Sequence, residues 1–289
     1  MECLTMSWKI SNQSLSQQSL LNNESIFSVG NGYLGVRGNF EEGYGEGMSS
    51  IRGTYINAFH DITEIAYGEK LYGFPETQQK LVNIIDAQTV EIYIGEEEEK
   101  FSLFHGEVLS YDRLLHLDKG YVERSVHWKS PKGKEVKLTF QRLVSFTCKE
   151  LFIINVKVEP VNFKGKVKIK STIDGDVSNY VASNDPRIGS SHGKLLKIKE
   201  VGLKQDCLYV LDETTVSKLE QERTEDEKSI EEAFTFHVED VLQFTKWNVY
   251  TDTLRHKDGL VEKGIAFVND AVEKEVSYWF QEQEKYVAA

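Results

Sequence analysis

Apolar residues alternate with polar ones at every second position through much of the chain between about residues 88 and 173. This spacing is typical of β-strands buried on one face, because successive side chains of a strand point to opposite sides. The clearest segments are 135–146, 151–160 and 166–173. Sequences suited to short turns separate them, at Ser130–Gly133 and Val161–Gly165. Because such short turns join antiparallel neighbours, the pattern predicts a large antiparallel β domain.

The end of the chain follows a different period. From about residue 257, the residues that would share one face of a helix recur at steps of three and four, which is typical of an amphipathic helix. They are Ile265, Val268, Val272, Val276, Trp279, Gln283 and Val287. We therefore expect a β-sandwich domain over residues 1–256 and a helical segment over residues 257–289. The acidic stretch Glu220–Glu232 is expected to be an exposed loop or short helix.

The bulk properties restrict the partners. A net charge of −12 argues against nucleic acid or an anionic membrane surface, because phosphate groups require basic patches. No apolar run reaches the roughly 18–20 residues of a membrane span, and the N-terminus lacks the layout of a secretory signal. The three cysteines, Cys3, Cys148 and Cys207, are scattered without metal-ligand spacing. We expect a cytoplasmic protein with reduced thiols and no metal site.

The segment from Glu24 to Gly53 is rich in glycine, and Gly30, Gly32 and Gly35 spell G-x-G-x-x-G. A dinucleotide site would require a helix to open after the third glycine and a carboxylate about twenty residues further on. Instead, the sequence continues with a β-branched valine, another glycine and an asparagine, and no such carboxylate follows. We therefore interpret the segment as strand edges joined by a tight turn at Asn31–Gly32.

No catalytic motif stands out in the chain. Metalloprotease, P-loop, nucleophile-elbow and paired C-x-x-C patterns are missing from the sequence. Asp174 and Asp176 flank a glycine, which favours a turn over the two separated carboxylates of a glycosidase.

The strongest candidate for a ligand site is a run that combines aromatic and polar side chains. The residues are Arg52, Tyr55, Asn57, His60 and Asp61. Aromatic rings stack on the C–H faces of sugars while polar groups bind hydroxyls, so this composition suits a sugar. Packing of the aromatic residues in a core, with His60 capping a turn, is the alternative interpretation.

Several segments together carry a family resemblance. Glu24–Gly43 and Arg52–Asp61 closely resemble the start of glycoside hydrolase family 65, which includes maltose, kojibiose, nigerose and trehalose phosphorylases. Trp8–Ile10, Tyr121–Trp128 and Gln141–Pro160 are also similar to the family. The resemblance covers essentially the whole chain.

The resemblance implies a fold and a reaction. The N-terminal domain of the family is a large antiparallel β-sandwich, a supersandwich similar to aldose mutarotases, and a helical linker joins it to an (α/α)6 barrel. Residues 257–289 look like that linker, cut before the barrel begins. Family members invert an α-glucosidic linkage with inorganic phosphate as co-substrate and without another cofactor. Since the acid and the phosphate pocket belong to the barrel, no catalytic residue carries over, and this chain alone is expected to be inactive.

The resemblance also implies roles for the domain. These are to act as a scaffold for its own barrel, to take part in a homodimer and to shape the active-site mouth for an α-linked glucose disaccharide. The segment Glu41–Pro75 is the candidate for that mouth, with Arg52, Tyr55, Asn57, His60 and Asp61 nearest to the sugar or the domain interface. A free-standing carbohydrate-binding sandwich and a mutarotase-like enzyme are the alternatives.

Overall fold

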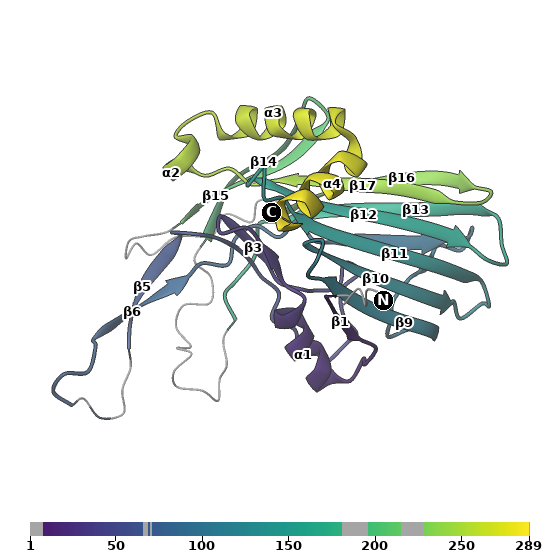
Figure 1. Ribbon diagram of the computed structural model, residues 1–289, viewed down its shortest axis with the longest axis horizontal. Coiled ribbons are helices and arrows are strands. Elements are labelled where there is room, and N and C mark those ends of the chain that lie inside the picture. The colour runs from purple at the N-terminus through teal and green to yellow at the C-terminus, as the bar shows by residue number, and fades with distance from the viewer. Residues whose placement is uncertain (1–7, 66–68, 70, 181–195, 215–227, 289) are drawn as a thin grey trace, which may run out of the picture.

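The computed structural model describes residues 8–65, 69, 71–180, 196–214 and 228–288. These residues form mainly antiparallel β-strands, with one helix near the start and several at the end (Figure 1). Two large sheets make a sandwich, to which three small sheets and the C-terminal helices are attached. The expected fold, an antiparallel β-sandwich followed by helices, is confirmed.

The larger sheet has six strands, each antiparallel to its neighbours. In order across the sheet they are β1 (Lys9–Asn12), β9 (Glu107–His116), β10 (Tyr121–Lys129), β11 (Glu135–Val144), β12 (Leu151–Pro160) and β17 (Leu242–Val249). The second sheet has four strands, in the order β16 (Ser229–Val238), β13 (Gly165–Asp174), β7 (Val90–Ile94) and β8 (Glu99–Lys100). Strands β9 to β12 are consecutive neighbours, as their short turns require.

Three small sheets and four helices complete the described chain. The small sheets are β2 (Val29–Gly30) with β3 (Leu34–Val36) and β4 (Thr54–Ile56), β5 (His60–Glu64) with β6 (Thr77–Leu81), and β14 (Leu196–Lys204) with β15 (Cys207–Thr214). The helices are α1 (Gln17–Ile26), α2 (Thr253–His256), α3 (Leu260–Glu273) and α4 (Glu275–Ala288).

The two large sheets face each other across an apolar core. On β11, Val136, Leu138 and Phe140 are almost completely buried. Ile92 of β7 and Val167 of β13 are fully buried in the same core from the other sheet. The alternation in the sequence therefore marks the strand faces that point into the sandwich.

A second apolar cluster lies on the outer face of the six-stranded sheet, beneath the C-terminal helices. Leu143, Leu151 and Ile153 are fully buried there with Ala271 of α3 and Trp279 of α4. The Trp279 indole N–H donates to the carbonyl oxygen of Ala271 at 3.0 Å. The predicted amphipathic segment is thus confirmed, and its apolar face covers the sheet.

Gln283 of α4 is a polar residue on this apolar face, and it is 2% exposed. Its side-chain oxygen accepts from the backbone N–H of Phe146 at 3.0 Å. Its amide nitrogen donates to the carbonyl oxygens of Gly120 at 3.0 Å and Val144 at 3.2 Å. One side chain therefore satisfies backbone groups from the β9–β10 turn and from the end of β11.

The continuous helical pattern of the sequence is divided in the structure. Helix α3 ends at Glu273, and α4 begins at Glu275, whose φ of 60° turns the chain. The change of direction lets α3 pack against β17 and β15 while α4 crosses the turns of the six-stranded sheet. The predicted domain boundary at residue 256 falls between α2 and α3, and its role as a boundary stays a prediction.

The acidic stretch is only partly described. Residues 220–227 lie outside the described residues, so the expectation for them stays a prediction. The expectation of a loop or helix is wrong for its last residues, because Ser229–Glu232 begin strand β16. They pair with β13, and Glu231 forms a 2.6 Å ion pair with Lys170 of that strand. Neutralisation by the neighbouring lysine makes an acidic strand possible.

The glycine-rich segment forms the predicted hairpin. Strands β2 and β3 pair antiparallel, and Gly32 has a φ of 85° that favours glycine. The Asn31 side chain accepts from the N–H groups of Tyr33 and Leu34, each at 2.9 Å. No helix opens after Gly35, so the geometry of a dinucleotide site is missing. Helix α1, just before the hairpin, escaped prediction because it has no strongly apolar face.

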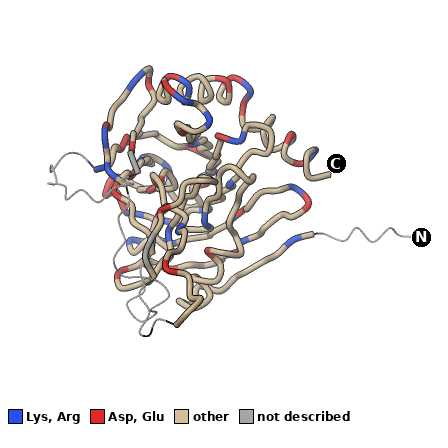
Figure 2. The backbone as a smooth tube through the Cα atoms, turned by 90° about the vertical axis from the view of Figure 1, so that its left-hand side faces the viewer, with Lys and Arg blue, Asp and Glu red and all other residues tan. Residues whose placement is uncertain are grey.

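Charges are interspersed along the chain in the view of Figure 2, where basic and acidic positions lie close to one another on the same elements. No helix in the described part of the chain is long and apolar enough to cross a membrane.

Candidate functional site

Four basic side chains lie on the core face of the six-stranded sheet, one from each of four strands. They are Arg113 of β9, Arg124 of β10, Arg142 of β11 and Lys246 of β17. Arg113 and Arg124 are directly opposite each other in the register, and all three arginines are 2% exposed. Buried like charges are unfavourable unless acidic or polar groups accompany them.

Glu41 and Glu42, from the glycine-rich segment, supply the compensating charge. Arg124 donates to Glu41 at 2.6 Å and to both carboxylate oxygens of Glu42, at 2.7 and 2.6 Å. Arg142 lies 3.3 Å from the other oxygen of Glu41 and donates to the carbonyl oxygen of Asn39 at 2.7 Å. The segment is therefore held between the sheets by charge-assisted hydrogen bonds.

The pKa values follow from this arrangement. Burial alone would raise the pKa of Glu41, but Arg124 and Arg142 outweigh it and hold the pKa below its usual value. Burial lowers the pKa of Arg142 to about 10, although Glu41 opposes this effect. The Glu41 carboxylate is thus ionised at neutral pH and serves as the shared counter-ion of two strands.

Arg113 is stabilised mainly by aromatic faces. Its guanidinium lies 4.7 Å from the centre of the Phe27 ring and 5.4 Å from that of Phe40, which are cation–π distances. It also donates to the carbonyl oxygen of Gly38 at 2.8 Å. A Cβ atom on Gly38 would lie 2.7 Å from the carbonyl oxygen of Phe27 and 3.0 Å from the Arg113 guanidinium. Glycine is therefore required here for close approach.

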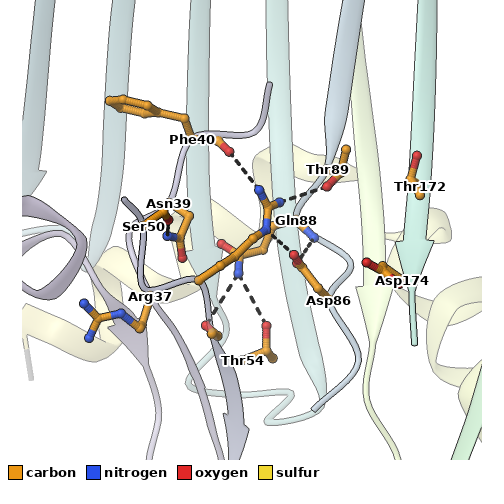
Figure 3. A network of polar contacts seen from close by, with 12 residues as sticks. Arg37, Asn39, Phe40, Ser50, Thr54, Asp86, Gln88, Thr89, Thr172 and Asp174 are labelled. Carbon is orange, nitrogen blue, oxygen red and sulfur yellow. Dashed lines mark hydrogen bonds and ion pairs between the residues drawn. The ribbon is translucent and has the colours of Figure 1, made fainter. Parts of the chain in front are cut away.

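Arg52 extends the charge pattern toward the second sheet. Figure 3 shows Phe40, Asp86 and Thr89 converging on one guanidinium group. Arg52 forms an ion pair with Asp86 and donates to the Thr89 hydroxyl at 2.9 Å. The other oxygen of Asp86 accepts from the N–H of Gln88 at 2.8 Å.

These contacts form one connected set, because the Gln88 side chain accepts in turn from Arg142. We refer to its charged members as the inner ion network, which consists of Glu41, Glu42, Arg52, Asp86, Arg124 and Arg142.

Lys246 lies beside the inner ion network and connects the two sheets. Its ammonium donates to the carbonyl oxygens of Thr89 at 3.0 Å and Thr172 at 2.8 Å. Burial lowers the pKa of Lys246 to about 7, although Asp86 opposes this effect. The amine is held by these two backbone carbonyls, and no ion pair with a carboxylate is seen among the residues that the structure describes.

The structure separates Arg52 from the other predicted site residues. Arg52 belongs to the inner ion network, whereas Tyr55 lies on β4 with its ring against Gly53. Burial raises the pKa of Tyr55. Among the described residues, no hydrogen bond or ion pair joins Arg52 to Tyr55, Asn57, His60 or Asp61. The five residues therefore do not form one polar cluster.

The remaining predicted residues lie near the surface. Asn57 is exposed, and its carbonyl oxygen accepts from Arg255 at 3.0 Å. His60 is exposed and Asp61 half-buried on β5, which pairs only with β6 in the described chain. The β5–β6 ribbon extends away from the sandwich at the lower left of Figure 1. Their proximity to a sugar or a domain interface stays a prediction.

Two hollows lie near these residues. A polar pocket of about 490 Å³ beside Arg52 is lined by Asp86, Asp174, Asp176 and Tyr180, among others. Asp174 accepts from the N–H of Asp176 at 2.9 Å, but Gly175 between them continues the pairing with the chain before β16 by donating to the carbonyl oxygen of Lys228 at 3.0 Å. No turn is assigned at residues 174–176, so the turn expected there is not seen. A larger cavity of about 830 Å³ lies between β17, β15 and α3 and is lined by aliphatic and aromatic side chains together with polar ones, Lys246 among them.

Metal chemistry has no evident site in the part of the chain that the structure describes. No group of three His, Cys, Asp or Glu side chains is placed there to hold an ion.

Sequence reasoning missed most of the inner ion network. One signal was available, because Arg142 shares the apolar face of its strand with Val136, Leu138 and Phe140. A charge at an inward position of an alternating strand indicates a buried partner. The sequence does not show that Glu41 is this partner, since about one hundred residues separate it from Arg142.

Replacing Arg124 by methionine should destabilise the fold strongly, because Glu41 and Glu42 would stay buried without their main partner. We expect the free energy of unfolding to fall by about 3–5 kcal/mol in denaturant titrations. The control is Lys129→Met on the same strand, which breaks an exposed 3.6 Å pair with Glu107 and should cost less than about 1 kcal/mol. Equal effects of the two changes would contradict this interpretation.

Lys246 should make stability depend on pH. With a folded pKa of about 7 and an unfolded value of 10.5, the unfolded chain binds more protons between these values, so stability should rise with pH across this window. Relative to Lys246→Met, the wild type should gain about 2 kcal/mol in unfolding free energy between pH 7 and 9. The exposed Lys197→Met serves as control, and a wild-type profile parallel to that of Lys246→Met would refute the prediction.

Comparison with known proteins shows which family has this sequence and architecture. The family model described as "Glycosyl hydrolase family 65, N-terminal domain" matches residues 10–289. An α,α-trehalose phosphorylase of Geobacillus stearothermophilus is 57% identical over 274 residues, which are 90% of this chain and 36% of the relative. A kojibiose phosphorylase of Halothermothrix orenii is 36% identical over 172 residues, covering 60% of this chain and 20% of that protein.

A solved structure agrees with the fold. The structure titled "Putative kojibiose phosphorylase from human microbiome" superposes with a TM-score of 0.79 at 16% sequence identity, covering 98% of this chain and 38% of that one. The chain thus spans little more than a third of the length of the proteins it matches best among these. It belongs to glycosyl hydrolase family 65, as an N-terminal domain of that family.

Proposed function

We propose that this chain is the non-catalytic N-terminal domain of an inverting disaccharide phosphorylase. The parent enzyme would convert an α-glucoside and inorganic phosphate to β-glucose 1-phosphate and a free sugar. The observation that carries the proposal is the match to about a third of a trehalose phosphorylase at 57% identity over 90% of this chain. This relative favours α,α-trehalose as the disaccharide over kojibiose or maltose.

The use of the charged residues supports a structural role. Glu41 and Glu42 of the glycine-rich segment, and Asp86, are engaged by arginines of the inner ion network. A catalytic acid must instead reach its substrate with a suitable pKa, and that of Glu41 is held low. The domain then acts as a scaffold for a barrel that contains the acid and the phosphate pocket. Its cytoplasmic location stays a prediction.

The β5–β6 ribbon is the part that we assign to the barrel interface. His60 and Asp61 begin the ribbon, and Tyr55 and Asn57 lead into it. Apolar side chains along it are exposed, with Ile62 at 65% and Leu71 at 61%. Exposed apolar groups on a projecting element are typical of contact surfaces. In this arrangement the ribbon shapes the mouth of the active site, while Arg52 holds its base through Asp86.

An activity assay tests the main proposal. Incubated with α,α-trehalose and phosphate, the 289-residue chain should form no glucose 1-phosphate, whereas a chimera should form it. In that chimera, this chain replaces the matching third of the Geobacillus stearothermophilus enzyme. Sustained turnover by the chain alone would refute the scaffold role. Binding of trehalose without turnover, measured by NMR titration, would instead favour the alternative of a carbohydrate-binding sandwich that uses the pocket beside Arg52.

The role of the ribbon can be tested in the same chimera. His60→Ala and Leu71→Ser should raise the KM for the sugar acceptor in the synthetic direction by about threefold to tenfold, since each removes roughly 1 kcal/mol of contact. The stability of the isolated chain should not change, because both side chains are exposed. Leu203→Ser on β14, with an equally exposed leucine at 62%, is the matched control. Identical acceptor kinetics in all three variants would contradict the assignment of the ribbon to the barrel interface.

A further inference from the structure

The cavity of about 830 Å³ between β17, β15 and α3 has the volume of a small-molecule site, since such sites span about 300–1,000 Å³. Helix α3 forms one of its walls, where the helix packs against β17 and β15 (Figure 1). Each of the three elements contributes apolar side chains to the lining, such as Val210 of β15, Trp247 of β17 and Val268 of α3. The cavity is therefore able to bury the apolar part of a ligand.

A glycine interrupts the row of side chains that α3 presents to the cavity. The row has a spacing of four residues, which places its members on one face of the helix, and all of them line the cavity: Leu260, Gly264, Val268 and Val272. Glycine destabilises the interior of a helix relative to alanine. Close packing does not require it here, because a Cβ atom on Gly264 would meet no described atom within 4 Å. The missing side chain therefore leaves open volume in the wall that α3 forms.

Lys246 supplies the lining with a cationic group. Its side chain is half-buried, and its ammonium donates to the carbonyl oxygens of Thr89 and Thr172. An ammonium has three N–H donors, and no third acceptor is seen among the residues that the structure describes. A ligand oxygen would complete these hydrogen bonds, and a negatively charged oxygen would also stabilise the buried charge. The lowered pKa of this amine, about 7, reflects burial that a bound anion would compensate.

Four acidic side chains also line the cavity, and none of them forms an ion pair with Lys246 in the part of the chain that the structure describes. They are Asp206, Asp212, Glu232 and Asp252. Asp206 and Glu232 are exposed. Asp252 already accepts from the Tyr33 hydroxyl at 2.8 Å and from Arg255 at 3.2 Å. The acids of the lining therefore leave the position beside the Lys246 amine to an anionic group of a ligand.

We propose that this cavity binds an apolar molecule that carries one carboxylate, with the carboxylate on the Lys246 ammonium and the apolar part against α3. The lining of apolar side chains buries the ligand, and the charged amine fixes its orientation, which is the usual division of roles in a small-molecule site. Gly264 keeps open the space that the apolar part fills.

This site goes beyond the proposed function, because neither phosphate nor a glucose disaccharide has an apolar part that such a lining would bury. Lys246 and Gly264 belong neither to the inner ion network nor to the β5–β6 ribbon. A failure of the trehalose assay leaves the site unaffected, and a chain that binds no carboxylate leaves the trehalose assay unaffected.

Isothermal titration calorimetry of the 289-residue chain with decanoate tests the site at about pH 6.5, where most of the Lys246 amine is protonated. We expect saturable binding of decanoate in a one-to-one complex. Decanol has the same carbon chain without the charge and should bind about tenfold more weakly. Lys246→Met should weaken the binding of decanoate about tenfold, because it removes the charged donor, and should change that of decanol by less than about threefold.

A second variant tests the location of the site even if Lys246→Met folds poorly. Gly264→Leu fills the wall of the cavity and should weaken the binding of both ligands about tenfold. The melting temperature of the free chain should not fall, because leucine forms helices better than glycine. The matched control is Ala266→Leu, which adds the same side chain at an exposed position of α3 outside the lining and should leave binding unchanged.

Three results would overturn the proposal. The first is a wild-type chain that does not bind decanoate. The second is binding that Gly264→Leu leaves as strong as Ala266→Leu does, since the ligand would then lie elsewhere. The third is an equal loss of decanoate and decanol binding in Lys246→Met, since the amine would then not hold the carboxylate.

Discussion

The ion pair of Glu41 with Arg124 and Arg142 is the interaction on which the rest of the domain depends. It places a carboxylate from residue 41 between two strands that lie about one hundred positions further along the chain. Without it, the core face of the six-stranded sheet would hold adjacent buried arginines whose charges repel. A buried charge cluster of this kind contributes less net stability than an apolar core of equal size. Its effect is to fix which segment fills the space between the sheets.

The glycine-rich segment has its composition because of this position. To bring Glu41 and Glu42 to Arg124, the chain must pass close to Phe27 and to the guanidinium of Arg113. At the point of closest approach, position 38, these neighbours leave no room for a side chain, and glycine occupies it. The same passage directs Arg52 to Asp86 and Phe40 to the rings and guanidinium groups around it. The segment that resembles the family most closely is therefore also the segment that places the carboxylates of Glu41 and Glu42 between the two sheets.

Much of the fold could be predicted from the sequence, because alternation and helical spacing are local. The alternation predicted a buried strand face, and Val136, Leu138 and Phe140 lie on it. The helical spacing predicted an apolar helix face that packs on another surface, and Trp279 lies on that face. Contacts between residues far apart in the sequence leave no such local pattern and could not be predicted. Nothing near Glu41 in the sequence indicates Arg124, and the weakly apolar helix α1 gives no periodic signal. Of the candidate site residues, Arg52 is held by the carboxylate of Asp86, thirty-four positions further along the chain. The composition of the sequence around Arg52 does not reveal this partner.

Gln283 has a mechanical consequence. Its single amide holds backbone groups of Phe146, Gly120 and Val144 at a buried position. If α4 rotated about its axis or slid by one residue, these groups would lose their partners where water is scarce, at a cost of about 1–3 kcal/mol each. Rotation or sliding of helix α4 against the six-stranded sheet is therefore opposed by these three hydrogen bonds. The same amide couples the position of α4 to the β9–β10 turn and to the end of β11.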